Sequence, residues 1–470
     1  MANNNTQFKK AGSFYLIGNL FNKGISFLTV PIFTRILSTT DYGIVTTYGS
    51  WVVILTMVIG CAMHMGVRAA FIDYKNEIDD ILTTITSFTL VSGAVYCFFI
   101  GLIALMINKS ISVIIVLCVL QGLSCALIEN FSMYLMMQYK YKFRTFLMIA
   151  PNLISAIISI LTILFITKNK LYLGRIVPTA FIMIGFAFLL IVIIYKKGTP
   201  LFSRKYIKYI LSISAPLVLH GIALNILSQS DRTMITWLAD SSQTGIYSLI
   251  YNFSMIATVI TTSLEGIWIP WFYERLKNRE INTINFIAKD FISLMTICMV
   301  CVIFAGPEVV KIMSSNKYWE GIVIIPPVIL SNYVIFAYTL YVNIEHFYKK
   351  TASITINTMT AACSNIILNL IFIPKYGYIA AAYTTLASYT LSFVLHAKKA
   401  KKLDANVYPI ISFIVPFICV ICASVIFYIF LSKWYLRWTI LIFYVVLMLI
   451  NKKNRILFYF PSVKEKLHLK

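Results

Sequence analysis

Apolar runs of 18 or more residues recur along almost the entire chain, and short polar segments separate them. A helix of about 20 residues crosses the roughly 30 Å hydrocarbon core of a membrane. A membrane β-barrel would instead show short segments of alternating polarity. The pattern predicts an all-α polytopic membrane protein with about 14 transmembrane helices. We expect these helices at residues 11–35, 44–64, 81–107, 111–138, 145–167, 171–195, 211–236, 244–272, 284–306, 321–345, 352–373, 379–396, 408–431 and 437–450.

The composition agrees with a membrane protein. Of the 470 residues, 59% are hydrophobic and 12% are charged, whereas a soluble chain has about 25% charged residues. The N-terminal segment MANNNTQFKK is polar. The apolar run that follows it is too long for a signal peptide and lacks a small-residue cleavage site, so we expect it to form the first helix.

Basic residues explain the net charge of +23. They gather in alternate connections, which favours a cytoplasmic location for those connections and for both termini. Because they are dispersed over many short loops, they indicate contact with anionic lipid heads and argue against a nucleic-acid partner. The basic connections are residues 9–10, 140–144, 196–208, 275–279, 349–350, 398–402 and the tail 452–470.

Nothing in the sequence indicates an enzyme. The nine cysteines lie within apolar runs, where free cysteine behaves as a small hydrophobic residue, so we expect no metal or redox site and no cofactor. No P-loop lysine motif occurs, which argues against ATP hydrolysis by this chain. No loop is long enough for a soluble catalytic domain.

Two hairpins about 200 residues apart resemble each other. FTRILSTTDYGIVTTYGSW occupies residues 33–51, and ITWLADSSQTGIYSLIY occupies residues 235–251. Aligning Gly43 with Gly245 pairs Thr34 with Thr236, and in both copies a Ser/Thr/Asp turn precedes a glycine that opens the next helix. Any two helical hairpins share some of these features, so chance similarity remains the alternative.

The register of the two hairpins favours a true repeat, because each is the first hairpin of a six-helix block and runs in the same direction. Such a parallel repeat predicts two pseudo-symmetric six-helix lobes around a central lumen. We place the lobes at residues 1–200 and 201–400. Residues 401–470 then hold two further helices and a basic tail.

Polar residues recur on one face of corresponding helices in the two halves. In the first predicted helix, Asn19, Lys23 and Ser26 share a face. In the seventh helix Asn225, Ser228 and Gln229 form a similar stripe. The repeat alignment places Lys23 on Asn225 and Ser26 on Ser228, so we expect these faces to line the lumen. Hydrogen bonding between packed helices is the alternative for such residues.

Asp231 and Arg232 lie well inside an apolar run, where each charge costs at least about 2.5–3.5 kcal/mol. Such residues mark a wet transport path by default. As sequence neighbours they point about 100° apart on a helix and need not pair with each other. Other intramembrane charges are Glu129 and Glu265, which with Asp231 are candidates for a coupling-ion site or a counter-charge.

Four stretches resemble the polysaccharide transporters of the MATE/MOP superfamily, the Wzx-type flippases of O-antigen and capsule repeat units. YLIGNLFNKGISFLTVPIFTRILSTTDYG covers residues 15–43, GVRAAFIDY covers 66–74, SQSDRTMITWLADSSQTGIYSLIYNFSMIA covers 228–257, and NLIFIPKYGYIAAAYTTLASY covers 369–389. Together the four stretches span most of the chain, and they follow one another in the same order as in the family. Ala381 departs from the pattern, since glycine is frequent there.

The resemblance implies that an undecaprenyl-diphosphate-linked oligosaccharide is flipped to the outer leaflet through the lumen, with the polysaccharide polymerase machinery as a candidate partner. A diphosphate needs cations, for which Lys23, Arg35, Arg68 and Arg232 are the candidates. The alternative for Lys23 and Arg35 is that their side chains snorkel to lipid head groups. The alternative for Arg68 is that it is a cytoplasmic residue that follows the positive-inside rule.

Other functions remain open at this point. A lipid II or teichoic-type flippase would differ only in head group. A multidrug or cation antiporter of the same superfamily usually has twelve helices and a lumen lined by carboxylates, unlike this chain. A membrane glycosyltransferase or polymerase would need a large outer loop or clustered acids, which the sequence lacks.

Overall fold

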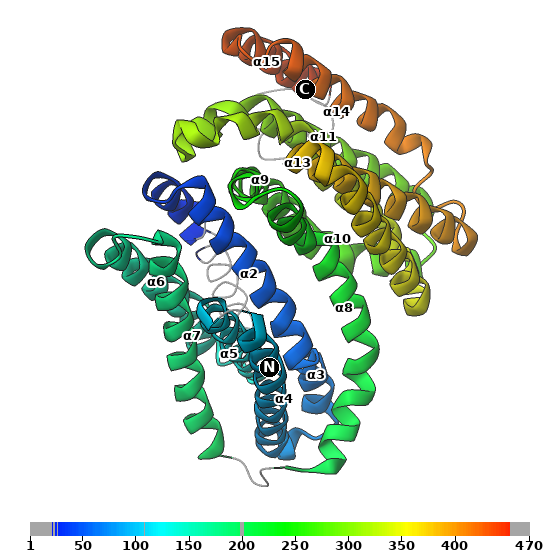
Figure 1. Ribbon diagram of the computed structural model, residues 1–470. Helices are drawn as coiled ribbons and strands as arrows, with labels where there is room; N and C mark the ends of the chain where they lie inside the picture. Colours follow the sequence, from blue (N-terminus) through cyan, green and yellow to red (C-terminus); the bar gives the residue numbers. More distant parts are fainter. Residues whose placement is uncertain (1–20, 22–23, 26, 108, 198–201, 452–470) are drawn as a thin grey trace. The chain divides into compact units, whose positions relative to one another are not determined.

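The computed structural model describes residues 21, 24–25, 27–107, 109–197 and 202–451, and this part of the chain is helical without strands. The predicted all-α membrane fold is confirmed (Figure 1). A short apolar helix covers Phe27–Ile36, at the end of the first predicted span. The elements that follow are α2 (Thr39–Gly60), α3 (Met63–Asp73), η1 (Lys75–Glu77), α4 (Ile78–Ile107), α5 (Lys109–Met137), α6 (Tyr141–Leu161), η2 (Thr162–Ile166), α7 (Leu171–Tyr195), α8 (Arg204–Leu238), α9 (Ser241–Phe253), α10 (Met255–Lys277), α11 (Ile281–Met313), η3 (Asn316–Ile324), α12 (Ile325–Phe347), α13 (Thr351–Leu403), α14 (Ile411–Ile429) and α15 (Trp434–Asn451).

Within the described residues, 11 helices are long and apolar enough to cross a membrane. Every predicted span from the second onward coincides with a helix, but two predicted spans are joined in α13, which is 53 residues long. Gly377 breaks the helical geometry of α13 with φ 59° and ψ −143°, a conformation that glycine adopts without strain. α8 is not among the 11 helices, and it carries the polar stripe of the seventh predicted span.

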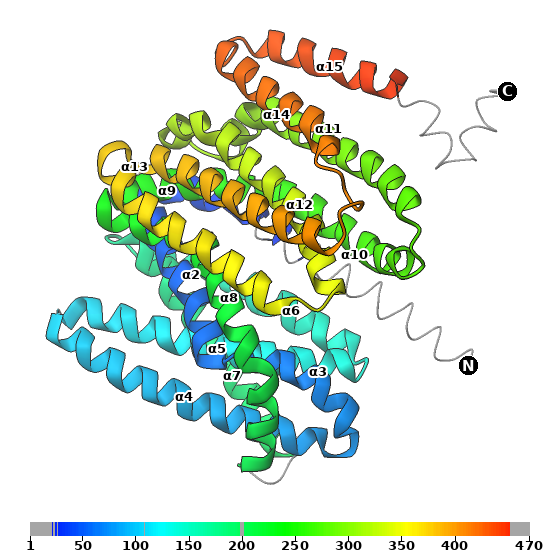
Figure 2. The ribbon, with the colours of Figure 1, turned by 90° about the vertical axis from the view of Figure 1, so that its right-hand side faces the viewer.

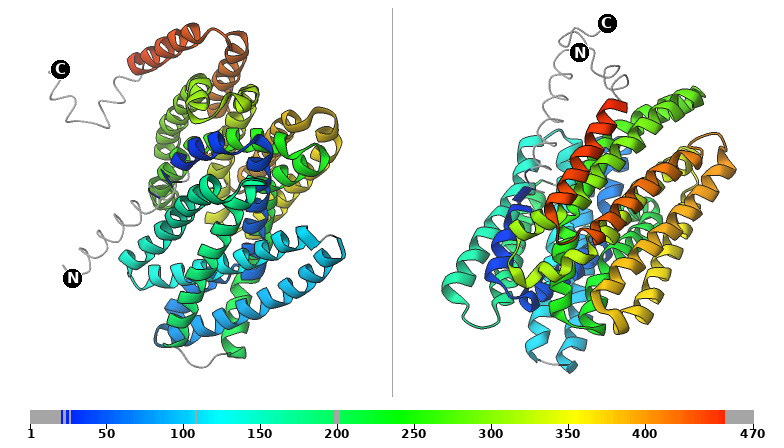
Figure 3. Two further views of the ribbon diagram at one scale, coloured as in Figure 1. Left: turned by 60° about the vertical axis from the view of Figure 1, so that its left-hand side comes forward. Right: turned by 90° about the horizontal axis from the view of Figure 1, so that it is seen from above.

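The chain divides into two compact units. Unit 1 comprises residues 1–252, 312–320 and 351–388, and unit 2 comprises 253–311, 321–350 and 389–470. In unit 1, α2 contacts α5, α7 and α8, and α4 and α5 form an antiparallel hairpin (Figures 2 and 3). In unit 2, α12 contacts α10 and α14. The division into lobes at residues 200 and 400 stays a prediction.

The two copies of the repeated hairpin meet inside unit 1. A Cβ atom on Gly43 of α2 would lie 1.7 Å from the carbonyl oxygen of Ser241, and a Cβ atom on Gly245 of α9 would lie 2.1 Å from that of Thr39. Thr39 corresponds to Ser241 in the alignment, so the two close contacts are equivalent. The beginnings of α2 and α9 therefore touch backbone to backbone, and only glycine can occupy the two contact points.

Hydroxyl pairs reinforce this contact. The Thr39 and Ser242 hydroxyls lie 2.6 Å apart. Further along the same helices, the Ser248 hydroxyl donates to that of Thr46 over 3.0 Å. Thr46 and Ser248 are also equivalent in the repeat alignment, so their hydrogen bond lies where the two copies are symmetric. The pairing supports a true repeat and argues against chance similarity.

Alanine at either contact glycine should push α2 and α9 apart. We expect Gly43→Ala and Gly245→Ala each to destabilise the protein by about 1–3 kcal/mol, as overpacking does elsewhere. The measurement is the thermal unfolding midpoint of the purified protein in detergent. Gly49→Ala in α2 is the matched control, because a Cβ there meets nothing within 4 Å. Equal midpoints for all three variants would contradict the close contact.

Candidate functional site

α8 carries a buried carboxylate that accepts three hydrogen bonds. Asp231 is 1% exposed. The Tyr247 hydroxyl of α9 donates to it over 2.6 Å, the Asn369 amide over 2.8 Å and the Thr385 hydroxyl over 2.6 Å. The last two residues lie on either side of the Gly377 break in α13. Because each donor stabilises a negative charge that burial disfavours, the three together hold the carboxylate inside the helix bundle.

The carboxylate belongs to a continuous polar network. The Asn365 oxygen accepts from the Ser230 hydroxyl over 3.2 Å, and the Asn365 amide donates to the Thr385 hydroxyl over 3.2 Å. Thr384 donates to the oxygen of Asn369. Within the described part of the chain, no lysine, arginine or histidine forms an ion pair with Asp231. We call Asp231, Tyr247, Asn365, Asn369, Thr384 and Thr385 the Asp231 network.

Arg232 faces a different set of partners, as the 100° offset predicts. It is 7% exposed, and its Nη1 donates to Gln229 over 2.8 Å and to the Ser228 carbonyl over 3.3 Å. The same Gln229 oxygen accepts from the Ser50 hydroxyl of α2 over 3.1 Å. The guanidinium lies 4.9 Å from the ring centre of Tyr251, within the range of a cation–π interaction. Gln229 and Arg232 thus connect α8 to the first copy of the repeat.

The remaining stripe residues of α8 bond to their own helix. Asn225 donates to the Gly221 carbonyl over 2.9 Å, and Ser228 donates to the Asn225 carbonyl over 3.3 Å. Asn19, Lys23 and Ser26 lie outside the described residues, so their predicted lumen position stays a prediction.

The other predicted cations are far from each other. Arg35 donates to the Ile312 carbonyl over 3.0 Å, and Arg68 donates to the Met133 sulfur over 3.4 Å. Both side chains are exposed. The 22-residue helix α2 separates them, which corresponds to about 33 Å along its axis. A single diphosphate therefore cannot contact Arg35 and Arg68 at the same time.

The two other predicted acidic residues also lie apart. Glu129 faces a cavity of about 420 Å³ in unit 1, and its Oε2 is 3.8 Å from Nδ1 of His64. Arg144 and Asn152 line the same cavity. Glu265, in unit 2, accepts a hydrogen bond from the Thr339 hydroxyl over 2.8 Å. Neither carboxylate joins the Asp231 network.

Residues 8–276, more than half of the chain, match a family described as "Polysaccharide biosynthesis protein". The chain belongs to this family. A Lsg locus protein of Haemophilus influenzae is 23% identical over 57% of this chain and 66% of its own length, just under two thirds of that relative. Another protein of that organism, described as a membrane protein, is 22% identical over 74% of this chain and 85% of its own length.

Solved structures show the same fold. The lipid II flippase MurJ, in an inward closed conformation, has a TM-score of 0.71 at 17% identity and covers 94% of this chain and 99% of its own. An inward-facing multidrug resistance MATE transporter of the MOP superfamily has a TM-score of 0.61 at 11% identity, over 82% of this chain and 96% of its own. The predicted resemblance is confirmed, and the chain is a multi-pass membrane protein of the polysaccharide biosynthesis family.

Sequence reasoning missed several polar groups that contact one another inside the two units. In α7, Arg175 stacks 4.2 Å from the ring centre of Phe33 and donates to the Ser159 hydroxyl over 3.2 Å. In unit 2, Glu345 and His396 are fully buried and 2.5 Å apart. These single residues lie in apolar runs far apart in sequence, so only the folded chain pairs Glu345 with His396.

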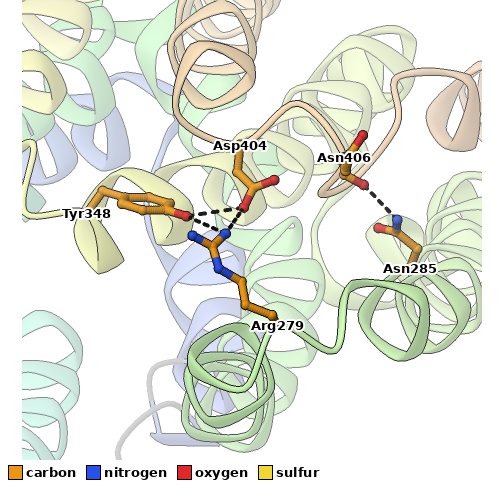
Figure 4. A network of polar contacts seen from close by, with 5 residues as sticks. All are labelled: Arg279, Asn285, Tyr348, Asp404 and Asn406. Atoms are coloured by element: carbon orange, nitrogen blue, oxygen red, sulfur yellow. Dashed lines mark hydrogen bonds and ion pairs between the residues drawn. The ribbon is translucent and has the colours of Figure 1, made fainter.

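A further polar network in unit 2 links the connections that follow α10, α12 and α13 (Figure 4). Arg279, after α10, donates to Asp404 over 2.9 Å and to the Tyr348 hydroxyl over 3.2 Å. Tyr348 follows α12, and Asp404 follows α13. Burial and the hydrogen bond to Asp404 raise the pKa of Tyr348, so its phenol stays protonated and donates to that carboxylate over 3.1 Å at neutral pH. Asn285 donates to the Asn406 carbonyl over 2.7 Å in the same region.

Removing one donor from Asp231 should destabilise the fold. We expect Tyr247→Phe and Thr385→Val each to cost about 1.5–3 kcal/mol, the range for hydrogen bonds to charged groups. Thr360→Val in α13 is the control, because the exposed Thr360 hydroxyl donates to a carbonyl of its own helix. Thermal unfolding of the purified protein measures the difference. Two variants as stable as the control would show that the network contributes nothing to stability.

Proposed function

We propose that this protein flips an undecaprenyl-diphosphate-linked oligosaccharide repeat unit across the bacterial cytoplasmic membrane by alternating access. The product would serve O-antigen, capsule or exopolysaccharide assembly. The family assignment supports a place in polysaccharide synthesis, and the fold supports transport. The observation that carries the mechanism is the paired contact of α2 and α9 at Gly43 and Gly245.

The contact has the properties of a gate. By the positive-inside rule, α2 and α9 begin on the extracytoplasmic side, away from the basic connections. The contact consists of glycines and small hydroxyl residues, so it closes tightly but buries few large apolar side chains. In this proposal the described state is closed to the outside, and α2 and α9 separate when the substrate leaves.

Among the candidate cations in the described part of the chain, Arg232 is the best placed to bind the diphosphate. Its Nη1 atom donates to Gln229 and to the Ser228 carbonyl, and a planar guanidinium binds phosphate oxygens in a bidentate manner. The amide and hydroxyl groups of Asn225 and Ser228 on the same helix would hydrogen-bond the sugars once the lumen is wet. Lys23, Asn19 and Ser26 would provide the equivalent face in the first lobe.

Asp231 is the proposed coupling-ion site. Its network offers one carboxylate and several neutral oxygens, a set that suits a proton or a monovalent cation such as sodium. Within the described residues, no three Asp, Glu, His or Cys side chains gather to hold a metal ion. Because the donors come from both sides of the Gly377 break, binding a cation would change how the two parts of α13 are held.

Locking the gate should stop export. In a chain with its nine cysteines replaced, we expect Thr39→Cys combined with Ser242→Cys to form a disulfide and abolish surface polysaccharide, and a reductant to restore it. The control pair is Thr236→Cys and Thr244→Cys, whose hydroxyls lie 2.8 Å apart within one copy of the repeat. Export by the fully cross-linked first pair would refute the gate.

Transport in vesicles tests the substrate and the coupling. Purified protein in proteoliposomes should flip undecaprenyl-diphosphate-linked oligosaccharide, faster under a sodium or proton gradient. Two further substrates test the alternative functions that the MurJ and MATE folds suggest. Lipid II tests a lipid II flippase, and a cationic dye tests a multidrug antiporter. Flipping of lipid II alone, or transport of the dye alone, would reject the proposed substrate.

The variant Asp231→Asn should reduce transport to the rate seen without a gradient, because it removes the only charge of the network. Asp73→Asn is the control, since Asp73 is exposed and lies outside the network. An unchanged gradient dependence in Asp231→Asn would exclude Asp231 as the coupling site.

A further inference from the structure

Unit 1 contains a second, larger cavity, separate from the α8 stripe. It has a volume of about 1000 Å³ and is lined by residues of the α8–α9 connection, by Glu320 of η3 and by the turn of α13 around Gly377. This volume is at the upper end of the range for small-molecule sites. By the positive-inside rule these connections lie on the extracytoplasmic side, because α8 and α13 both begin at basic connections on the opposite side.

The cavity wall is held in a fixed shape. The Gln243 side chain accepts a hydrogen bond from the Tyr378 backbone amide over 3.1 Å and donates to Asp240 over 2.9 Å. A Cβ atom on Gly377 would lie 1.9 Å from the Gln243 oxygen, and Gly377 has a positive φ of 59°. Only glycine satisfies both conditions, so Gln243 and Gly377 together fix the turn.

The lining combines exposed aromatic rings with carboxylates. Tyr376 is 64% exposed, Tyr383 is 48% exposed and Phe372 is 39% exposed. The carboxylates are those of Asp240 and Glu320, which outnumber the one cation in the lining, Lys375. Sugar rings pack their C–H faces on aromatic rings and donate hydroxyl hydrogens to carboxylate oxygens. A diphosphate, in contrast, would meet like charge.

We propose that this cavity binds neutral or amino sugars of the lipid-linked oligosaccharide on the extracytoplasmic side. The inference rests on the proposed function for the identity of the substrate, but the cavity lies outside the α8 stripe assigned to the lumen. Thr384 connects the two sites, because it lines the cavity and also donates to Asn369 of the Asp231 network. Sugar bound against Thr384 would therefore bias the network that holds Asp231.

Photo-crosslinking in living cells tests the site. The photoreactive amino acid p-benzoylphenylalanine replaces Tyr376 in the full chain, or Phe372 as a second position on the wall. Cells that make surface polysaccharide are irradiated, and the adducts on the purified protein are identified by mass spectrometry. Position 371 is the control, because Ile371 is 50% exposed on the same helix and does not line the cavity.

We expect saccharide adducts at positions 376 and 372, at least about tenfold more abundant than at 371. Phospholipid adducts alone, no adducts, or equal saccharide adducts at all three positions would overturn the proposal. The result is independent of the transport assay. Saccharide adducts without flipping in vesicles would support the cavity and refute the proposed function, whereas flipping without saccharide adducts would refute the cavity alone.

Discussion

The architecture of unit 1 depends on a backbone contact that excludes every side chain larger than hydrogen. At Gly43 and Gly245, α2 and α9 approach so closely that a methyl group would overlap a carbonyl oxygen of the other hairpin. In a membrane, where apolar surface gains little by leaving lipid for protein, close packing of small residues is a main source of helix association. The hydroxyl pairs of Thr39 with Ser242 and Thr46 with Ser248 then add directional bonds at the same surface.

Buried charge is the second constraint, and the adjacent residues Asp231 and Arg232 have different hydrogen-bond partners. Asp231 is enclosed by donors from α9 and α13, whereas Arg232 is directed toward α2 by Gln229. A bare charge at this depth would be expelled or neutralised. The donors to Asp231 lie on α9 and α13, so the hydrogen bonding of this one carboxylate on α8 is linked to the packing of all three helices. That linkage is what a coupling site in a transporter requires.

Much of the fold could be read from the sequence. The apolar runs located the helices, and the glycine-centred hairpins identified the repeat that the contact of Gly43 with Gly245 supports. The separate orientation of Asp231 and Arg232 followed from helix geometry alone. The partners of Asp231 could not be predicted, because Asn, Thr and Tyr in apolar helices have many possible neighbours and only tertiary packing selects among them. The same reason hid the pairing of Glu345 with His396.

Distance measurements between spin labels test the central claim that the repeat contact opens during transport. Labels at the exposed positions 40 and 237 report on the two copies, one at the beginning of α2 and one at the end of α8. We predict one short distance in vesicles without substrate, and a second, longer distance when undecaprenyl-diphosphate-linked oligosaccharide is added. A single unchanged distance with and without substrate, and with and without an ion gradient, would contradict the account.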